Sequence, residues 1–83
     1  MAKVSVLYFA GLRDAVGLSE ESVELGAGIT TVGQLCEHLA SLHRPYAERK
    51  SHVRVARNEA FACGEERLVD GDVVALIPPV AGG

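Results

Sequence analysis

The residues at the C-terminal end of the sequence, Gly82-Gly83, carry no side chains. Because glycine has no Cβ, a diglycine can approach a partner more closely than other residues can. The reactive group expected here is therefore the α-carboxylate of Gly83. A frayed terminus or a cloning remnant would also end in glycines, so this alternative stays open until the rest of the chain is considered.

Two adjacent prolines precede this end, and proline supplies no backbone N–H. They should end a strand and direct the chain out of its sheet. At about 3.3 to 3.6 Å per residue, the segment from the first proline onward can reach roughly 20 Å. We therefore expect a folded domain over residues 1–77 and a flexible arm over residues 78–83. The arm consists of Pro78, Pro79, Val80, Ala81, Gly82 and Gly83.

The cysteines and histidines do not match a redox or metal motif. Cys36 and Cys63 lack CxxC spacing and are too few for a disulfide framework. His38, His43 and His52 lack the close spacing typical of metal ligands, so we expect no bound metal. A reduced, buried thiol is expected at Cys36. The sequence indicates no role for Cys63 or for the histidines.

Length and charge limit the class of protein. A chain of 83 residues has room for one domain, and its net charge of −3 argues against nucleic-acid binding. No apolar run approaches the length of a membrane span, and the first residues do not resemble a signal peptide. We therefore expect a cytoplasmic protein that binds neither nucleic acid nor membranes. No nucleophile is paired with a base, which disfavours an enzyme that acts alone.

The N-terminal third is predicted to form a β-hairpin with a wide connection. Alternation predicts a strand over residues 3–9, with Val4, Val6 and Tyr8 on one face. Residues 10–17 are long enough for one or two helical turns, closed by Gly17. A second strand is expected over residues 21–25.

One substantial helix is predicted in the middle of the chain. It should begin at Thr30 or Thr31, which are both competent N-caps, and end near His43. Apolar residues recur at helical spacing and form one stripe, which consists of Val32, Leu35, Cys36, Leu39 and Leu42. Residues 45–51 begin with a proline and read as a charged surface loop.

The C-terminal half is predicted to add three strands, over residues 52–57, 60–63 and 72–77. Turns are expected at Asn58-Glu59 and Asp70-Gly71. The order of strand, strand, helix, strand, short strand, strand indicates an α+β fold. In this fold one β-sheet is covered on one face by a single main helix.

The last strand is apolar on both faces, although one helix covers only one face of a sheet. We expect Val74 and Leu76 to face the helix. Ile77 then lies on the other face, where it can join Phe9 and Phe61 in an exposed apolar patch beside the arm. Such patches usually mark interaction sites. The alternative is that these residues are singly exposed or covered by a loop.

Three segments carry a resemblance to a known family: FAGLRDAVG (residues 9–17), the DGD turn (residues 70–72) and LIPPVAGG (residues 76–83). Together with the element order, they resemble the MoaD family, the small sulfur carrier subunits of molybdopterin synthase. The resemblance covers the whole chain and implies a ubiquitin-like β-grasp fold with one mixed sheet. The family often has aromatic residues where Leu76-Ile77 stand here.

The resemblance implies that this subunit donates sulfur while the catalytic residues lie on another subunit. A MoeB-like enzyme would use ATP to adenylate the Gly83 carboxylate, which then becomes a thiocarboxylate. Gly82 would keep the arm narrow enough to enter active sites. On a MoaE-like large subunit, the sulfur would pass to the cyclic pyranopterin precursor and form the molybdopterin dithiolene of the molybdenum cofactor.

The resemblance also implies partners and a site. It implies a heterotetrameric synthase, and no cofactor bound by this chain. The expected partner interface consists of Phe9, Arg13, Phe61, Ile77, Pro78, Pro79, Val80 and Ala81. For Arg13, an interface anchor and an ordinary solvated arginine stay open. Three rival functions also remain: a sulfur carrier for thiazole, cysteine or tRNA thiolation, a ubiquitin-like protein modifier, and a plain binding module.

Overall fold

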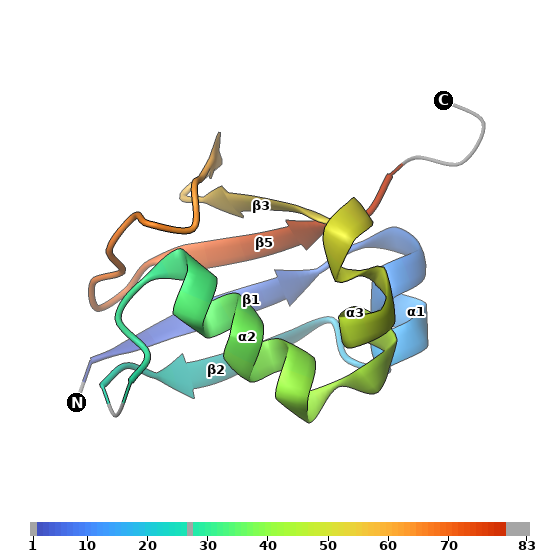
Figure 1. Ribbon diagram of the computed structural model, residues 1–83, viewed down its shortest axis with the longest axis horizontal. Helices are drawn as coiled ribbons and strands as arrows, with labels where there is room; N and C mark the ends of the chain where they lie inside the picture. Colours follow the sequence, from blue (N-terminus) through green and yellow to red (C-terminus); the bar gives the residue numbers. More distant parts are fainter. Residues whose placement is uncertain (1, 27, 80–83) are drawn as a thin grey trace.

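The computed structural model describes residues 2–26 and 28–79, which form one β-sheet with helices packed against it (Figure 1). The predicted α+β architecture is confirmed. In chain order the elements are β1 (Lys3–Tyr8), α1 (Ala10–Val16), β2 (Glu20–Glu24), α2 (Val32–Leu42), α3 (Arg44–Arg49), the 3-10 helix η1 (Lys50–His52), β3 (Arg54–Arg57), β4 (Ala60–Phe61) and β5 (Val73–Ile77).

The sheet has the strand order β2-β1-β5-β3-β4. The two central strands, β1 and β5, run parallel, and every other neighbouring pair is antiparallel. The sheet is therefore mixed, as the resemblance implied. In register, Val6 lies opposite Val74, and both side chains are fully buried.

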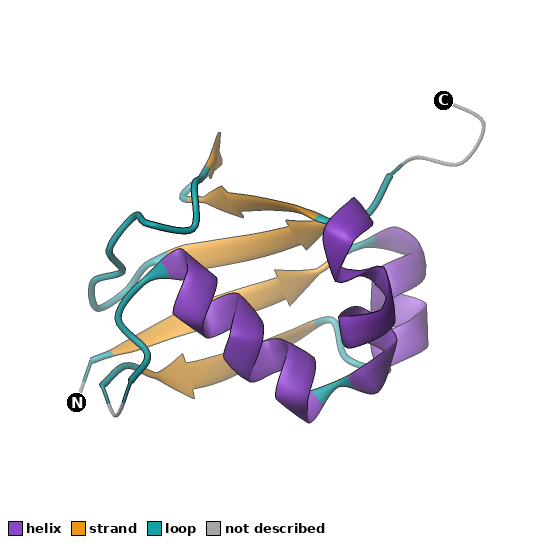
Figure 2. Ribbon diagram, viewed as in Figure 1, coloured by secondary structure: helices purple, strands orange, loops and turns teal. Residues whose placement is uncertain are grey.

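Alternation in β1 and β5 places one face of the sheet in the core. Val4, Val6 and Tyr8 of β1 are buried, as are Val74 and Leu76 of β5. These are the faces that the sequence pattern predicted to point inward. Helix α2 crosses this buried face, and α1 and α3 lie together at one end of the sheet, so the opposite face is left open (Figure 2).

Helix α2 begins as predicted, with Thr31 as its N-cap. The Thr31 hydroxyl accepts a hydrogen bond from the Gln34 backbone N–H, and the Gln34 side chain accepts one from the Thr31 backbone N–H. Four residues of the apolar stripe are buried, but Leu42 is 54% exposed. At about 100° per residue, Leu42 falls at the margin of the stripe, which explains its exposure.

The expectation of a surface loop over residues 45–51 is wrong. These residues form α3 and the 3-10 helix, and α3 packs against α1 and α2. Pro45 lies in the first turn of α3, where proline costs no helical hydrogen bond. Tyr46 is fully buried and supplies the apolar contact that holds this short helix on the core.

The turn predicted at Asn58-Glu59 is confirmed, since both residues have positive φ, at 51° and 72°. This conformation suits a tight hairpin turn and joins β3 to the short strand β4.

The C-cap of α1 is Gly17, with φ of 87°, as expected for a left-handed helix end. Among the described residues, no helix has the length and apolar character needed to cross a membrane.

Candidate interaction site on the open face of the sheet

An apolar hollow lies on the open face of the sheet. The strand register produces it, because the side chains of one row point to the same side. Leu7 lies opposite Ala75, Ala75 opposite Ala56, and Ala56 opposite Phe61. The lining consists of Leu7, Phe9, Ala56, Asn58, Glu59, Phe61, Val73, Ala75 and Ile77. We call these residues the open-face hollow.

The structure brings together the three patch residues that the sequence predicted. Phe9 is 42% exposed and Phe61 is 60% exposed, and both line the open-face hollow with Ile77. Exposed apolar side chains that gather in one patch commonly mark an interaction site. Their proximity is therefore confirmed, and their role in binding a partner stays a prediction.

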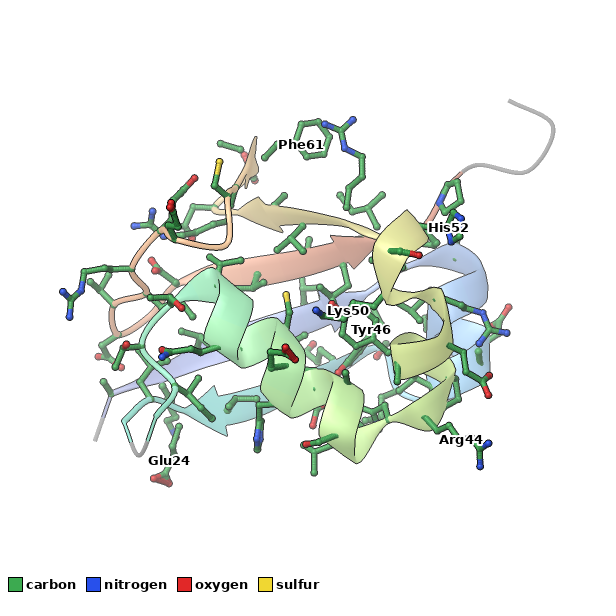
Figure 3. The ribbon with its side chains drawn as sticks, viewed as in Figure 1. Glu24, Arg44, Tyr46, Lys50, His52 and Phe61 are labelled. Carbon is green, nitrogen blue, oxygen red and sulfur yellow. The ribbon has the colours of Figure 1, made fainter. Side chains whose placement is uncertain are left out.

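A second hollow continues from the first around Phe9 and Ile77 to the point where the chain leaves the sheet. Pro78 and Pro79 line it. Further lining comes from α1, α3, η1 and the residue after η1, and it includes Ala10, Gly11, Glu48, Arg49, His52 and Val53. Figure 3 shows His52 at the end of the sheet where β5 ends. The predicted interface residues of the proline pair therefore adjoin the open-face hollow.

Two parts of the predicted site are not brought together with these hollows. Arg13 lies exposed in the last turn of α1 and lines neither of them. Val80, Ala81, Gly82 and Gly83 lie outside the described residues.

The sequence reasoning missed Arg54, whose guanidinium carbon lies 3.7 Å from the centre of the Phe61 ring. Both residues lie on the open face, because Arg54 alternates with Ala56, and Ala56 pairs with Phe61. Alternation over residues 52–57 predicts that Arg54 points outward, but nothing in the sequence marks it as part of a site. The contact itself depends on the hairpin register, which the sequence did not define.

Asp72 fixes the turn at the edge of the open-face hollow. Its buried carboxylate accepts hydrogen bonds from Arg57 Nε at 2.9 Å, Asn58 Nδ2 at 2.8 Å and the Val69 backbone N–H at 2.9 Å. Burial alone would raise the pKa of Asp72, but these donors outweigh it and lower the pKa. The Asn58 turn is thereby fastened to the start of β5.

The thiols do not contribute to the hollows. Cys36 is buried on the core side of α2, and burial raises the pKa of its thiol, so the thiolate needed for sulfur chemistry is disfavoured. Cys63 is exposed and free, in the loop after β4. In the ranges 2–26 and 28–79, no cluster of three or more potential metal ligands occurs.

A mixed sheet of this order, crossed by one main helix on one face and left open on the other, defines a ubiquitin-like β-grasp domain. Comparison with known proteins then identifies the family. The chain belongs to the ThiS family, which it matches over residues 6–83.

Relatives of the chain include curated proteins and solved structures. The "Molybdopterin synthase sulfur carrier subunit" of Mycobacterium tuberculosis is 40% identical over 84 residues, covering 100% of both chains. The crystal structure of Haloferax volcanii small archaeal modifier protein 1 is 30% identical, covers 96% of this chain and 100% of that one, and has a TM-score of 0.83. A chain of the Amycolatopsis orientalis BexX/CysO complex is 27% identical, with coverage of 96% and 99% and a TM-score of 0.69.

Proposed function

We propose that this chain is a sulfur carrier subunit of molybdopterin synthase and that it carries sulfur as a thiocarboxylate on Gly83. The observation that carries the proposal is the similarity, over the full chain, to the curated relative of that name, at 40% identity. The open-face hollow supports it, because a carrier needs a surface by which its enzymes can hold it.

The proposed chemistry begins with activation of a poor electrophile. A MoeB-like adenylating enzyme uses ATP to join the Gly83 carboxylate to AMP, which is a good leaving group. The terminal sulfur of a persulfide displaces AMP, and a thiol reduces the acyl disulfide that forms, which leaves the thiocarboxylate. This chain supplies the reacting carboxylate and binds no cofactor itself. Gly82 adds no Cβ that would widen the segment on its way into an active site.

Sulfur transfer is proposed to take place on a MoaE-like large subunit. The thiocarboxylate sulfur, a soft nucleophile, attacks a carbon of the cyclic pyranopterin precursor and displaces an oxygen substituent of that carbon, which gives a thioester. Water then cleaves the acyl C–S bond of this thioester, which returns the Gly83 carboxylate and leaves the sulfur on the pterin as one sulfur of the dithiolene. The catalytic residues belong to the large subunit, and this chain contributes the donor and a docking surface. We propose a heterotetrameric synthase in the cytoplasm, where the ATP-dependent activation takes place. The complex formed by the Amycolatopsis relative supports the general idea that such a fold is held by a partner.

A second candidate function is protein modification, which the similarity to a small archaeal modifier protein favours. In that case the activated Gly83 carboxylate would form an isopeptide bond with a lysine amine. Conjugates of this chain on denaturing gels of native cells would support this function. The two functions share the activation step and differ in the final acceptor, which is a pterin carbon in one case and a lysine nitrogen in the other.

The mass of the intact chain tests the proposal. Co-expression with the adenylating enzyme and sulfur donor of the same organism should raise the mass by the difference between one sulfur and one oxygen. Removal of Gly83 should abolish this gain and abolish molybdopterin synthesis in a reconstituted assay. The melting temperature should stay unchanged, because the buried core ends at Leu76.

A matched control is Ala2→Ser, a conservative exchange at the other end of the molecule, which should keep the full mass gain. Normal synthesis by the chain that lacks Gly83 would contradict the proposal. So would the absence of a mass gain in the unaltered chain.

A further inference from the structure

The pair formed by Arg54 and Phe61 is a preorganised group at the edge of the open-face hollow. The Arg54 guanidinium lies over the Phe61 ring, with its carbon 3.7 Å from the ring centre. Figure 3 shows Phe61 at the edge of the sheet beyond β3, away from α2. Stacking on an aromatic face restricts the plane of a guanidinium, so less entropy is lost when it binds a ligand.

The charge of Arg54 is not neutralised by an ion pair within the described part of the chain. Arg57, three residues later, forms ion pairs with Asp72 at 2.9 Å and with Glu66 at 3.3 Å. Over residues 2–26 and 28–79, Arg54 makes no such pair, although its side chain is exposed beside an apolar surface. Its N–H donors are therefore free to bind an acceptor supplied by another molecule.

The position of Arg54 links this charge to the C-terminal end of the sheet. Arg54 lies opposite Ile77, the last residue of β5, and Ile77 lines both hollows. A partner that binds Arg54 would therefore be held beside Pro78-Pro79.

Three carboxylates of the open face lie away from Arg54 along or across the sheet. Glu59 lines the hollow at the hairpin turn, and Glu20 and Glu24 pair with Leu7 and Lys3 at the far edge of the sheet.

We propose that Arg54, held by Phe61, selects the partner by forming a bidentate pair with an Asp or Glu carboxylate that borders an apolar side chain on the partner. The inference rests on the proposed function, and the partner is the large subunit of the synthase. The apolar side chain occupies the open-face hollow, and the carboxylate meets the planar N–H fork of Arg54. Arg54 is thus a specificity-determining residue of the interface.

A protein carboxylate fits this place better than a phosphate of a nucleic acid. The hollow beside Arg54 is lined mainly by aliphatic and aromatic side chains, which would gain nothing from a hydrated polyanion. Glu59 in the same lining and the net charge of −3 would repel one. An apolar patch bordered by a single carboxylate complements both the hollow and the arginine.

Isothermal titration of the carrier with the large subunit of the same organism tests the inference. Arg54→Glu should weaken binding by about tenfold or more, because it replaces an attractive charge pair with a repulsive one. Arg54→Lys keeps the charge but loses the planar fork, and it should weaken binding by a smaller factor. The affinity of the unaltered chain should fall with added salt, and this dependence should be reduced in Arg54→Gln.

The matched control is Arg44→Glu, which makes the same change of charge on α3. Figure 3 shows Arg44 on the opposite side of the molecule from Phe61. Its side chain is 88% exposed in its pair with Glu48, so the control should fold and bind normally. Circular dichroism melting curves should show that the Arg54 variants remain folded.

The outcomes separate this inference from the proposed function. The role of Arg54 is overturned if Arg54→Glu binds with unchanged affinity or if Arg44→Glu loses as much affinity. It is also overturned if the unaltered carrier does not bind the large subunit. The gain in mass on activation is measured without the large subunit and tests the sulfur carrier function separately. A chain that gains sulfur but binds equally well with Arg54→Glu would leave that function standing and refute only the inference.

Discussion

At the scale of single residues, the two neighbours Leu76 and Ile77 have opposite roles. Leu76 is fully buried against the helices, whereas Ile77 lines the open-face hollow. The period of two along a strand separates them, and this is why the sequence was sufficient to predict both positions. The contact between Arg54 and Phe61 was not predictable in the same way, because it depends on two strands meeting in one register.

Alanine at each of these two positions should therefore give contrasting results. Leu76→Ala leaves a cavity in the core and should lower the free energy of unfolding by about 2–5 kcal/mol. Ile77→Ala should lower the free energy of unfolding by less than Leu76→Ala does, but it should weaken binding of the large subunit, since it removes apolar surface from the open-face hollow. Urea denaturation and titration calorimetry measure the two effects. Equal destabilisation by both substitutions would place Ile77 in the core and contradict this assignment.

At the scale of elements, the strength of the local signal decided which predictions succeeded. The start of α2 was predictable because Thr31 and Gln34 form a capping box over a clear apolar stripe. Helix α3 was missed because its six residues are mostly polar and begin with Arg44-Pro45. Its main anchor is Tyr46, and a single buried tyrosine shows no periodicity in the sequence.

The cap of α2 gives a prediction at this scale. Thr31→Ala removes the hydroxyl that accepts the Gln34 backbone N–H, and should lower the free energy of unfolding by about 0.5–2 kcal/mol. Thr31→Ser is the control, because it keeps the hydroxyl and should retain most of the stability. Both are measured by chemical denaturation. A loss in Thr31→Ser as large as that in Thr31→Ala would show that the methyl group, rather than the cap, stabilises this end.

At the scale of the whole molecule, a polar cluster joins the sheet to the helices. Glu21 of β2 accepts a hydrogen bond from the Tyr8 hydroxyl at 2.5 Å, and it contacts His43 Nε2 at 2.6 Å. His43 links the end of α2 to the start of α3, so one carboxylate connects two strands with the junction of two helices. The sequence could not predict this cluster, since its members are separated by 13 and 22 positions.

The two tyrosines of the chain predict how stability changes at alkaline pH. Burial, together with Glu21 for Tyr8 and with Cys36 for Tyr46, raises the pKa of each phenol well above its ordinary value. A raised pKa in the folded state means that the stabilisation is complete below the unfolded pKa of about 10 and is lost as pH rises toward the folded pKa.

Urea denaturation at several values between about pH 8 and 11 should therefore show a falling free energy of unfolding. Tyrosinate absorbance should appear together with unfolding, because both rings are buried. Tyr8→Phe should flatten the dependence, since it removes one titrating phenol. Tyrosinate absorbance that rises near pH 10 in the fully folded chain would contradict this account.

The parallel pairing of β1 and β5 also determines where a label can be attached without covering the second hollow. Parallel neighbours begin at the same end of a sheet, so Lys3 lies near the start of β5 and Pro79 lies beyond its finish, at the opposite pole (Figure 1). A fluorophore or affinity tag attached before Lys3 would therefore stand a full strand length away from the second hollow, which lies where β5 ends. Immobilising the protein through that pole would leave the surface around Ile77 facing the solution.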